Sequence, residues 1–156
     1  IPVGGGGLLA GVASVIKEQK EDVVIVAAQI VRNTGYVDSL ETKQALQNRP
    51  VDTRFEGIAV GNINPITFNL AKQVVDATVV LETDEIYHAA YDFRRETGTL
   101  LESAGAVGLA GARRLATEQD NKNIRVVTVA TGANPTNSFG PYIDARARRF
   151  GWGVDI

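Results

Sequence analysis

The chain has 156 residues, with 16 Lys and Arg against 18 Asp and Glu, and its formal net charge of −2 offers no attraction to nucleic acid or to an anionic membrane. Hydrophobic residues make up 44% of the chain, charged residues 22%, and no apolar run approaches the roughly 18 residues of a membrane span, which predicts a single soluble globular domain. The absence of cysteine excludes disulfides and thiolate chemistry, a single histidine argues against a histidine-based zinc site, and the cytoplasm is the expected compartment.

The first part of the chain predicts a strand, a turn, a helix and a second strand. Residues 1–3 are expected to end a buried strand, and four consecutive glycines at 4–7 are expected to form a turn. From Leu8 onward apolar residues recur at helical spacing, which predicts a helix. The β-branched run 23–28 is typical of a strand covered on both faces, so we expect a parallel sheet.

The middle of the chain has weaker signals. A helix is predicted over 38–47 and a loop over 48–54, whereas 55–60 is too short to assign. Pro65 is expected to open a further helix, because proline suits the first helical position. Residues 77–81 predict another buried strand.

After residue 82 the sequence first predicts two helices. Thr83 is expected to cap the first, because Asp84 and Glu85 follow it in the first turn, where the helix dipole favours acids. Ser103 is expected to cap the second, which runs over 104–118 and is rich in glycine and alanine. Glycine inside a helix costs about 1 kcal/mol relative to alanine, so we expect close packing as the compensation.

The remaining residues predict a last strand over 124–130, a turn over 131–137 and a basic helix over 142–150. Strand and helix patterns thus alternate along the chain without a repeat. This alternation predicts an α/β fold that is doubly wound, with a mostly parallel sheet and helices on both faces.

The glycines at 4–7 are the strongest functional signal in the sequence. Successive glycines between a strand and a helix let backbone N–H groups converge on an anion, which predicts a phosphate site. A tight turn that needs positive φ would explain one or two glycines but not four. A dinucleotide site is disfavoured because Gln29 stands where a ribose-binding acid is expected, and a P-loop is disfavoured because Leu8 and Leu9 follow Gly7.

Three further residues are candidates whose local patterns are not specific. Thr131 follows the predicted strand 124–130 at the expected carboxyl end of the sheet, where doubly wound folds bind ligands; a turn hydroxyl bonded to its own backbone is the alternative. Glu102 precedes a predicted helix, where a dipole-stabilised cap is the simpler interpretation. Gly57 lies in an apolar segment and indicates either a bulge or a flat ligand against the backbone.

Other polar groups are interpreted as structural. His88 lies one position from an apolar helix stripe and is expected to be structural or exposed. Arg146, Arg148 and Arg149 are expected to form a solvated face rather than a binding patch.

Five segments stand in a characteristic order and spacing. They are Pro2 to Gly11, Glu56 to Val60, Thr83 to Ile86, Glu102 to Ala106 and Thr131 to Asn134. Together they resemble the second half of the threonine dehydratase and serine racemase family, whose members are pyridoxal-phosphate enzymes of the tryptophan-synthase β fold. The similarity extends over nearly the whole chain, and five motifs in order are far more specific than any one of them.

The resemblance implies that the cofactor is pyridoxal 5'-phosphate. Its phosphate would be held by the backbone amides of Gly4, Gly5, Gly6, Gly7 and Leu8. Gly57 would pack against the pyridine ring and Glu102 would lie near it. Thr131 would hydrogen-bond the pyridine nitrogen, and since a hydroxyl does not force that nitrogen to stay protonated, the resemblance implies a dehydratase.

The chain also departs from the family pattern. The lysine that bonds the cofactor and removes the α-proton of the substrate lies upstream of the glycine loop in this family, and so does the loop that binds the substrate carboxylate. None of the five lysines of this chain matches that motif: Lys17, Lys20, Lys43, Lys72 and Lys122. Gln29 stands where some relatives carry an acid that binds a divalent cation, so we expect no metal.

Residues 1–156 are therefore interpreted as a partial catalytic domain of a hydroxyamino-acid ammonia-lyase that converts L-threonine or L-serine to a 2-oxo acid and ammonia. Expected partners are a small amino-acid substrate, the upstream part of the same enzyme and further copies in a homo-oligomer. The alternatives are a threonine synthase or β-replacement enzyme of the same fold, a non-catalytic domain that keeps the phosphate site, and an NAD-binding domain, which Gln29 disfavours.

Overall fold

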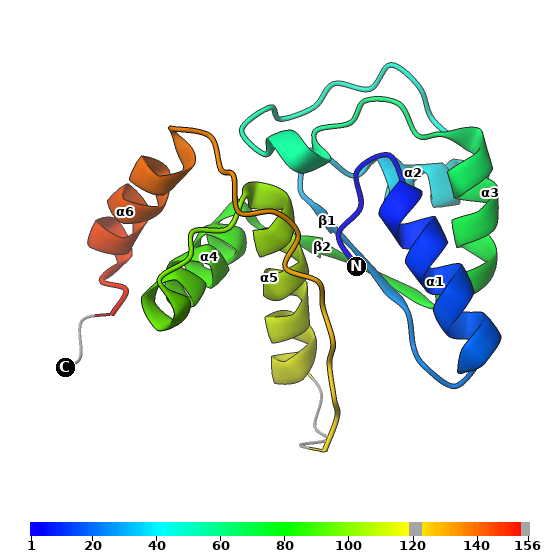
Figure 1. The fold of residues 1–156 in the computed structure, drawn as a ribbon. Coiled ribbons are helices and arrows are strands. Elements are labelled where there is room, and N and C mark those ends of the chain that lie inside the picture. The colour runs from blue at the N-terminus through cyan, green and yellow to red at the C-terminus, as the bar shows by residue number, and fades with distance from the viewer. Residues whose placement is uncertain (119–122, 154–156) are drawn as a thin grey trace. The chain divides into compact units, whose positions relative to one another are not determined.

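The computed structural model describes residues 1–118 and 123–153, and its chain divides into two compact units, Ile1–Val80 and Leu81–Ile156. Two strands, six α-helices and one short 3-10 helix follow one another along these described residues (Figure 1). Among them, no helix combines the length and the apolar character that crossing a bilayer requires.

The first unit is built on parallel strands. β1 (Val26–Ile30) pairs with β2 (Ala77–Leu81), and it also pairs with the first residues of the chain. The N–H of Val3 donates to the Ala28 carbonyl at 2.9 Å, and the N–H of Ala28 donates to the Ile1 carbonyl at 2.8 Å, which makes a parallel bridge. The predicted strand at 1–3 and the predicted parallel sheet are therefore confirmed.

Both strands differ in detail from the prediction. The strand predicted over 23–28 begins only at Val26, because the N–H of Ile25 donates to the Asp76 carboxylate at 2.6 Å and the N–H of Val23 closes a turn onto the Lys20 carbonyl. The bounds predicted for β2 are correct, but its first two residues are exposed and only Leu81 is fully buried. In the described sheet β2 has β1 as its only neighbour, so it is an edge strand rather than a central one.

Two helices of the first unit pack against each other, α1 (Gly7–Gln19) and α3 (Pro65–Val74), and Figure 1 shows them side by side. When two successive connections between parallel strands are both right-handed and run in the same direction across the sheet, their helices lie on the same face of that sheet. α3 begins at Pro65 as predicted, because the side chain of Asn64 accepts hydrogen bonds from the next backbone N–H groups. The core between these elements consists of Val3, Leu9, Ala10, Ala13, Ile25, Ala27, Tyr36, Ile63, Phe68 and Ala71.

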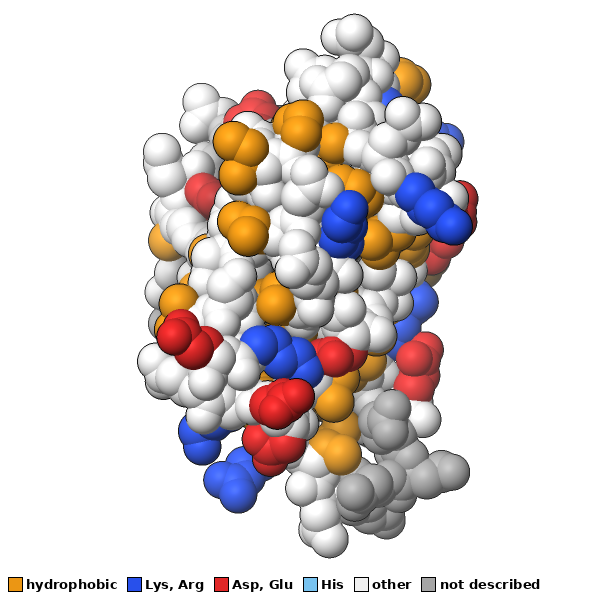
Figure 2. Space-filling view, turned by 90° about the vertical axis from the view of Figure 1, so that its right-hand side faces the viewer, with side chains coloured by type: hydrophobic (Ala, Val, Ile, Leu, Met, Phe, Trp, Pro, Cys, Tyr) orange, Lys and Arg blue, Asp and Glu red, His pale blue; other side chains and the backbone are white. Residues whose placement is uncertain are grey.

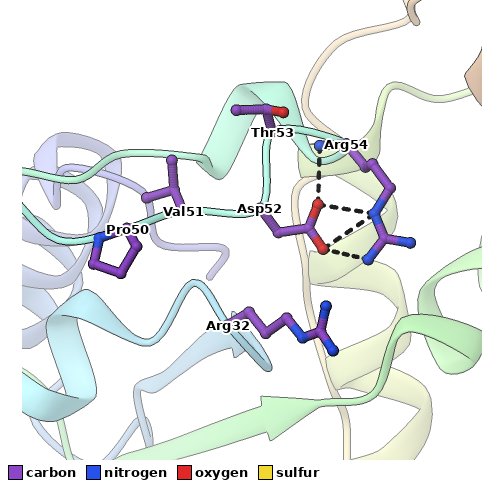
Figure 3. Close-up of a pocket in the computed structure, with 6 residues that line it drawn as sticks. All are labelled: Arg32, Pro50, Val51, Asp52, Thr53 and Arg54. Carbon is purple, nitrogen blue, oxygen red and sulfur yellow. Dashed lines mark hydrogen bonds and ion pairs between the residues drawn. The ribbon is translucent and has the colours of Figure 1, made fainter.

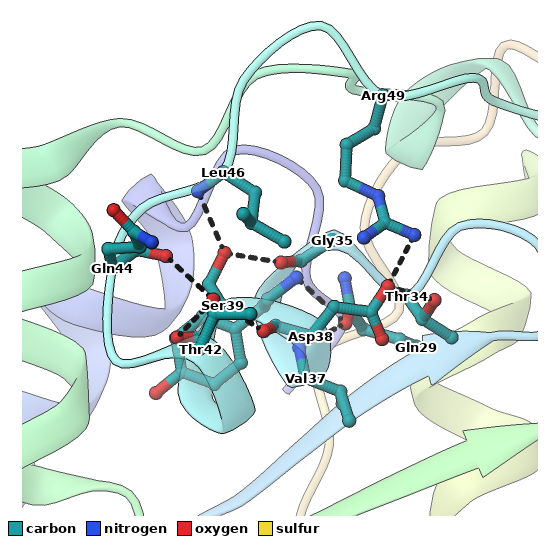
Figure 4. A network of polar contacts seen from close by, with 11 residues as sticks. Gln29, Thr34, Gly35, Val37, Asp38, Ser39, Thr42, Gln44, Leu46 and Arg49 are labelled. Carbon is teal, nitrogen blue, oxygen red and sulfur yellow. Dashed lines mark hydrogen bonds and ion pairs between the residues drawn. The ribbon is translucent and has the colours of Figure 1, made fainter.

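α2 (Gly35–Thr42) starts three residues earlier than the predicted helix over 38–47 and ends five residues earlier. The early start has a tertiary cause: the side-chain oxygen of Gln29, from the end of β1, accepts the N–H groups of Tyr36 and Val37 at 3.1 and 3.0 Å. Both N–H groups belong to the first turn of α2, where backbone N–H groups have no acceptor within the helix. Figure 4 shows this contact within a wider polar network.

Apolar side chains also reach the surface of this unit. Exposed ones on α1 and α3 are Leu8, Val15, Ile66 and Leu70. Figure 2 looks onto the side of the molecule that is on the right in Figure 1, and its hydrophobic side chains are interspersed with charged and other side chains. Single exposed apolar residues are usual on protein surfaces and require no special explanation.

Tyr36 is fully buried, and its hydroxyl has no hydrogen-bond partner among the described residues. Tyr36→Phe removes only this hydroxyl, so we expect the free energy of unfolding at pH 7 to rise by about 1 kcal/mol. Burial also raises the pKa of Tyr36 to about 12, above its ordinary value near 10. The folded chain therefore keeps this proton when the unfolded chain has lost it, and the neutral tyrosine contributes stability that falls as pH rises from about 10 to 12.

Urea unfolding of wild type and Tyr36→Phe at pH 7 and across pH 9 to 11.5 measures both effects. We expect the phenylalanine variant to lose less stability over the alkaline range. Tyr142→Phe, at an exposed tyrosine, is the matched control. A loss of more than about 1 kcal/mol in Tyr36→Phe at pH 7 would mean that the hydroxyl has a partner after all.

The described part of the second unit contains three helices, α4 (Thr83–Thr97), α5 (Ser103–Glu118) and α6 (Phe139–Phe150), with α4 packed against both others. The predicted cap of α4 is wrong by one residue. Glu82 is the N-cap, and its backbone N–H donates to the Glu85 carboxylate at 2.7 Å in a capping box. Ser103 is likewise the first residue of its helix and not a residue before it.

Ion pairs join α4 to its two neighbours. Arg114 of α5 pairs with Glu85, which raises the pKa of that guanidinium through its hydrogen bond to the carboxylate. Arg146 of α6 pairs with Asp84 and lies over the ring of Tyr87. The prediction of a wholly solvated basic face is therefore wrong for Arg146, because its guanidinium contacts both Asp84 and Tyr87 of α4.

The other residues of that predicted face, Arg148 and Arg149, are exposed as expected. His88 also fits its structural interpretation. Its ring stacks on Trp152 with centroids 4.6 Å apart, and its Nε2 lies 3.5 Å from the Asp92 carboxylate. The histidine therefore fixes the segment that follows α6.

The strand predicted over 124–130 is not formed in the structure. Val127 is 89% exposed, and no ladder pairs this segment with another described strand. A β-branched run forms a strand only when a neighbour accepts its backbone hydrogen bonds, and among the described residues this run has none. Its extended chain leads instead into the loop that contains Thr131.

Candidate functional site

The glycine loop connects the first bridge of the sheet to α1. Gly6 is the N-cap of that helix and has a φ of 92°, in the left-handed region. The first helical hydrogen bond is donated by the N–H of Ala10 to the Gly6 carbonyl at 2.9 Å, so the N–H groups of Gly7, Leu8 and Leu9 have no acceptor within the helix. The first turn contains no acidic residue. The loop therefore presents unbonded donors at the positive end of a helix dipole, which suits an anion.

Packing requires glycine at only two of the four positions. A Cβ at Gly4 would lie 3.1 Å from a methyl group of Val60 and 3.3 Å from the Cα of Ile58, and one at Gly6 would lie 2.9 Å from the hydroxyl of Thr67. Gly5 would make only an ordinary contact, and Gly7 would meet nothing within 4 Å. Glycine at these two open positions leaves the backbone accessible from outside, as a phosphate ligand requires.

Gly57 lies beside the start of the glycine loop. It is the middle residue of η1 (Glu56–Ile58), and its carbonyl oxygen is 3.4 Å from the place that a Gly4 Cβ would occupy. Gly57 itself is exposed. The structure thus brings together the predicted phosphate loop and the predicted ring-contacting glycine within the first unit.

Glu102 and Thr131 are neighbours in the second unit. The N–H of Glu102 donates to the carbonyl of Gly132 at 3.2 Å, and the Glu102 carboxylate fills the place where a Gly132 side chain would be. Gly132 has a φ of 75°. Thr131 is half-buried, and its backbone lies against Gly105 of α5, where a Cβ would come within 2.5 Å of the Thr131 carbonyl oxygen.

The backbone of Thr131 thus packs directly on Gly105, and the close packing expected in this glycine-rich helix is confirmed there. Sequence reasoning singled out neither Gly105 nor Gly132 as a site residue. Thr67 was also missed as a site residue, although Pro65 had identified the start of its helix. Its contact with the glycine loop joins residues 62 positions apart, so no local pattern could have revealed it.

Gln29, at the position where some relatives bind a cation, uses its amide inside the first unit. Its oxygen accepts two N–H groups of α2, and its nitrogen donates to the Val3 carbonyl at 3.2 Å. A carboxylate could accept in the same way but could not donate to Val3. The described residues contain no group of three or more His, Cys, Asp or Glu side chains placed to hold a metal ion.

The described lysines make surface contacts. Lys17 pairs with Asp76 at 2.9 Å, and Lys72 lies over the ring of Phe68. Lys20 and Lys43 are exposed, and Lys122 lies outside the described residues. The Asp76 pKa is lowered by its hydrogen bonds from the Ile25 N–H and from Lys17.

An open pocket of about 590 Å³ lies in the first unit between Arg32 and the loop 50–54 (Figure 3). Asn33 holds this loop, since its side chain donates to the Asp52 carbonyl and accepts the Asp52 N–H at 3.1 and 2.7 Å. The hydrogen bond from the Arg54 guanidinium lowers the pKa of the Asp52 carboxyl. None of the predicted site residues lines this pocket, so it is not part of the glycine-loop site.

Comparison with known proteins finds threonine dehydratases among the relatives of this chain. The chain is 32% identical over 134 residues to the biosynthetic L-threonine dehydratase of Burkholderia multivorans and 33% identical over 138 residues to the mitochondrial threonine dehydratase of Saccharomyces cerevisiae. Each alignment covers 86% of this chain but only 26% and 24% of those relatives, so the chain spans about a quarter of their length.

Solved structures show the same fold. The processed form of threonine deaminase isoform 2 from Solanum lycopersicum superposes with a TM-score of 0.89 at 32% identity, over 94% of this chain and 43% of that one. Maize serine racemase superposes with a TM-score of 0.77 at 20% identity, over 95% of this chain and 46% of that one, and shows likeness of fold alone. These matches confirm the predicted α/β fold.

The family model described as pyridoxal-phosphate dependent enzyme matches residues 1–132. That range includes the glycine loop, Gly57, Glu102 and Thr131, so every predicted site residue lies inside the match. The chain therefore belongs to the pyridoxal-phosphate dependent enzyme family, as its glycine loop and five ordered motifs had indicated.

Proposed function

We propose that this chain is the cofactor-phosphate half of a hydroxyamino-acid ammonia-lyase, which converts L-threonine or L-serine to a 2-oxo acid and ammonia. The observation that carries the proposal is the unbonded N-terminus of α1 at the end of a glycine loop free of acidic residues. The relatives named threonine dehydratase support the choice of reaction, although the chain spans only a part of them.

The residues present fit pyridoxal phosphate in two respects. The N–H groups of Gly7 and Leu8 are donors without an internal acceptor, and Gly4 and Gly6 lie where a side chain would collide with Val60 or Thr67. In the proposed complex the backbone amides from Gly4 to Leu8 bind the phosphate dianion. Gly57, which has no side chain to obstruct a flat ring, packs against the pyridine.

The family resemblance assigns Glu102 and Thr131, both in the second unit, to the ring of the cofactor. When bound, the cofactor withdraws electrons from the α-carbon of the substrate, which allows loss of the α-proton and of the β-hydroxyl. The Thr131 hydroxyl donates to the ring nitrogen and leaves it unprotonated, whereas an acid there would favour the protonated ring. Gly132 orients this pair, since its backbone bonds the Glu102 N–H and its missing side chain leaves space for the Glu102 carboxylate.

The partners of the complete enzyme belong to the same proposal. The catalytic lysine and the substrate-carboxylate loop would come from its upstream part, and the family resemblance supports a homo-oligomer. A cytoplasmic location is proposed, although relatives from plants and yeast are named for the chloroplast and the mitochondrion. Cell fractionation with an antibody against this chain would test the location.

Substitutions at Thr131 in the complete enzyme test the proposed reaction. Thr131→Ser is expected to keep activity, because either hydroxyl can bond the ring nitrogen. Thr131→Asp is expected to slow elimination at least about tenfold, because it favours the protonated ring. Thr131→Ala is expected to weaken cofactor binding by about 1 kcal/mol, or about fivefold, which is the usual net value of one hydrogen bond.

The measurements are 2-oxo acid release from L-threonine and L-serine, and the absorbance spectrum and dissociation constant of bound pyridoxal phosphate. Thr117→Ala is the matched control, because that residue is exposed and its hydroxyl donates to the Arg113 carbonyl of its own helix. Equal spectra and rates for the Ser and Asp variants would show that Thr131 does not touch the ring. No 2-oxo acid from either substrate would overturn the proposed reaction.

A further inference from the structure

Thr67, in the first turn of α3, joins that helix to the glycine loop. Its hydroxyl lies 2.9 Å from the Gly5 carbonyl oxygen, to which it can donate, and 3.1 Å from the carbonyl of Asn64. Thr67 is half-buried, and its own N–H donates to the Asn64 side chain at 3.3 Å. Both its backbone and its neighbour Phe68, which is fully buried in the core, fix the position of this hydroxyl.

The contact determines which way the loop donors face. In a trans peptide the carbonyl of one residue and the N–H of the next point in opposite directions. The Gly5 carbonyl faces the Thr67 hydroxyl, so the Gly6 N–H points away from α3. The Gly6 carbonyl accepts from Ala10 inside α1, so the Gly7 N–H points outward from the helix N-terminus. All described peptide bonds are trans.

Thr67 also restricts what can stand at Gly6. Its Oγ1 and Cβ lie 2.9 and 3.4 Å from the place that a Gly6 Cβ would occupy. The left-handed conformation of Gly6 is what turns the chain from the Gly5 carbonyl into the first helical peptide. One side chain thus fixes the carbonyl before Gly6 and fills the space beside it.

We infer that Thr67 is a positioning residue for the phosphate loop: its hydroxyl holds the Gly5 carbonyl so that the N–H groups of Gly6 and Gly7 face a phosphate ligand. The inference rests on the proposed function, since it assigns Thr67 to the site of the cofactor phosphate. Thr67 itself contacts the loop and not the ligand. A serine at this position keeps the hydroxyl, whereas a valine keeps the shape and loses it.

The test uses the 156-residue chain and two probes, inorganic phosphate and pyridoxal 5'-phosphate, with pyridoxal as the probe that lacks the phosphate. Backbone amide shifts of Gly6, Gly7 and Leu8 are followed by ¹⁵N NMR during titration. Thr67→Val is expected to weaken binding of both phosphate probes about fivefold and to shift the Gly6 amide before any ligand is added. Thr67→Ser is expected to bind as wild type does.

Thr42→Val is the matched control, since Thr42 is exposed and its hydroxyl bonds the Asp38 carbonyl on α2 in the same unit. Urea unfolding of every variant separates loss of binding from loss of folding. If Thr67→Val and Thr42→Val bind phosphate equally while Gly6→Val does not bind, the inference about Thr67 is overturned and the phosphate site stands. If wild type shows no phosphate-dependent shift in the loop, the proposed function fails with it.

Discussion

Replacing Gly6 with valine is expected to lower the affinity for pyridoxal phosphate by about 100-fold or more. The φ of 92° at this position is a conformation that a β-branched residue rarely adopts. The new Cβ would also lie 2.9 Å from the Thr67 hydroxyl. Since both effects force the loop to move, its N–H groups would no longer converge, and we expect a stability loss of about 2–3 kcal/mol as well.

Substitutions at two other glycines separate the effect on phosphate binding from the effect on stability. Gly7→Ala meets no atom within 4 Å, so it is expected to keep the fold and to weaken binding only by crowding the phosphate. Gly11→Ala, in the same helix and equally unobstructed, is expected to raise stability by about 0.5–1 kcal/mol and to leave binding unchanged. Equilibrium dialysis with pyridoxal phosphate and urea unfolding measure the three variants. Wild-type affinity in a folded Gly6→Val chain would exclude the loop as the phosphate site.

Elements with strong local signals could be predicted from the sequence. α3 begins at the predicted Pro65, because a proline and a preceding asparagine suffice to start a helix. β2 has its predicted bounds, and α1 begins one residue before the predicted Leu8. For α1 and α3 the residues that decide the boundary are adjacent in the chain.

Predictions failed where a distant residue decides the structure. α2 begins early because Gln29 caps it, and β1 begins late because Asp76 takes the N–H of Ile25. Residues 124–130 have the composition of a strand but lack a described partner. The local sequence pattern reveals none of these causes, since each depends on which segments come into contact after folding.

The residues of the candidate site likewise differ in whether the local sequence could identify them. The glycine loop could be predicted because four successive glycines are rare in a stable fold unless the backbone has a special task. Thr131 and Glu102 could be selected only through the family resemblance, since each has an ordinary local explanation. The sequence could not identify Thr67, Gly105 and Gly132 as site residues. Each of them matters because the backbone or side chain of another segment packs closely against it.

Gly105→Ala is the second substitution for which we expect a large effect. A Cβ there would lie 2.5 Å from the Thr131 carbonyl oxygen and 3.1 Å from its nitrogen, and both are backbone atoms that cannot rotate away. Either α5 or the loop must shift, at a cost of about 2–3 kcal/mol of stability, as is typical of overpacking. Thr131 would move with the loop, so cofactor binding in the complete enzyme is expected to fall further than in Thr131→Ala.

This comparison distinguishes displacement of Thr131 from simple loss of its hydroxyl. Alanine is the better helix former, so any stability loss at Gly105 reports the clash with Thr131, and Gly11→Ala gives the gain expected where no clash exists. If the loop could move away from α5 at little cost, Gly105→Ala would stabilise the chain as Gly11→Ala does. Equal gains from the two substitutions, with unchanged cofactor binding, would therefore show that α5 does not position Thr131.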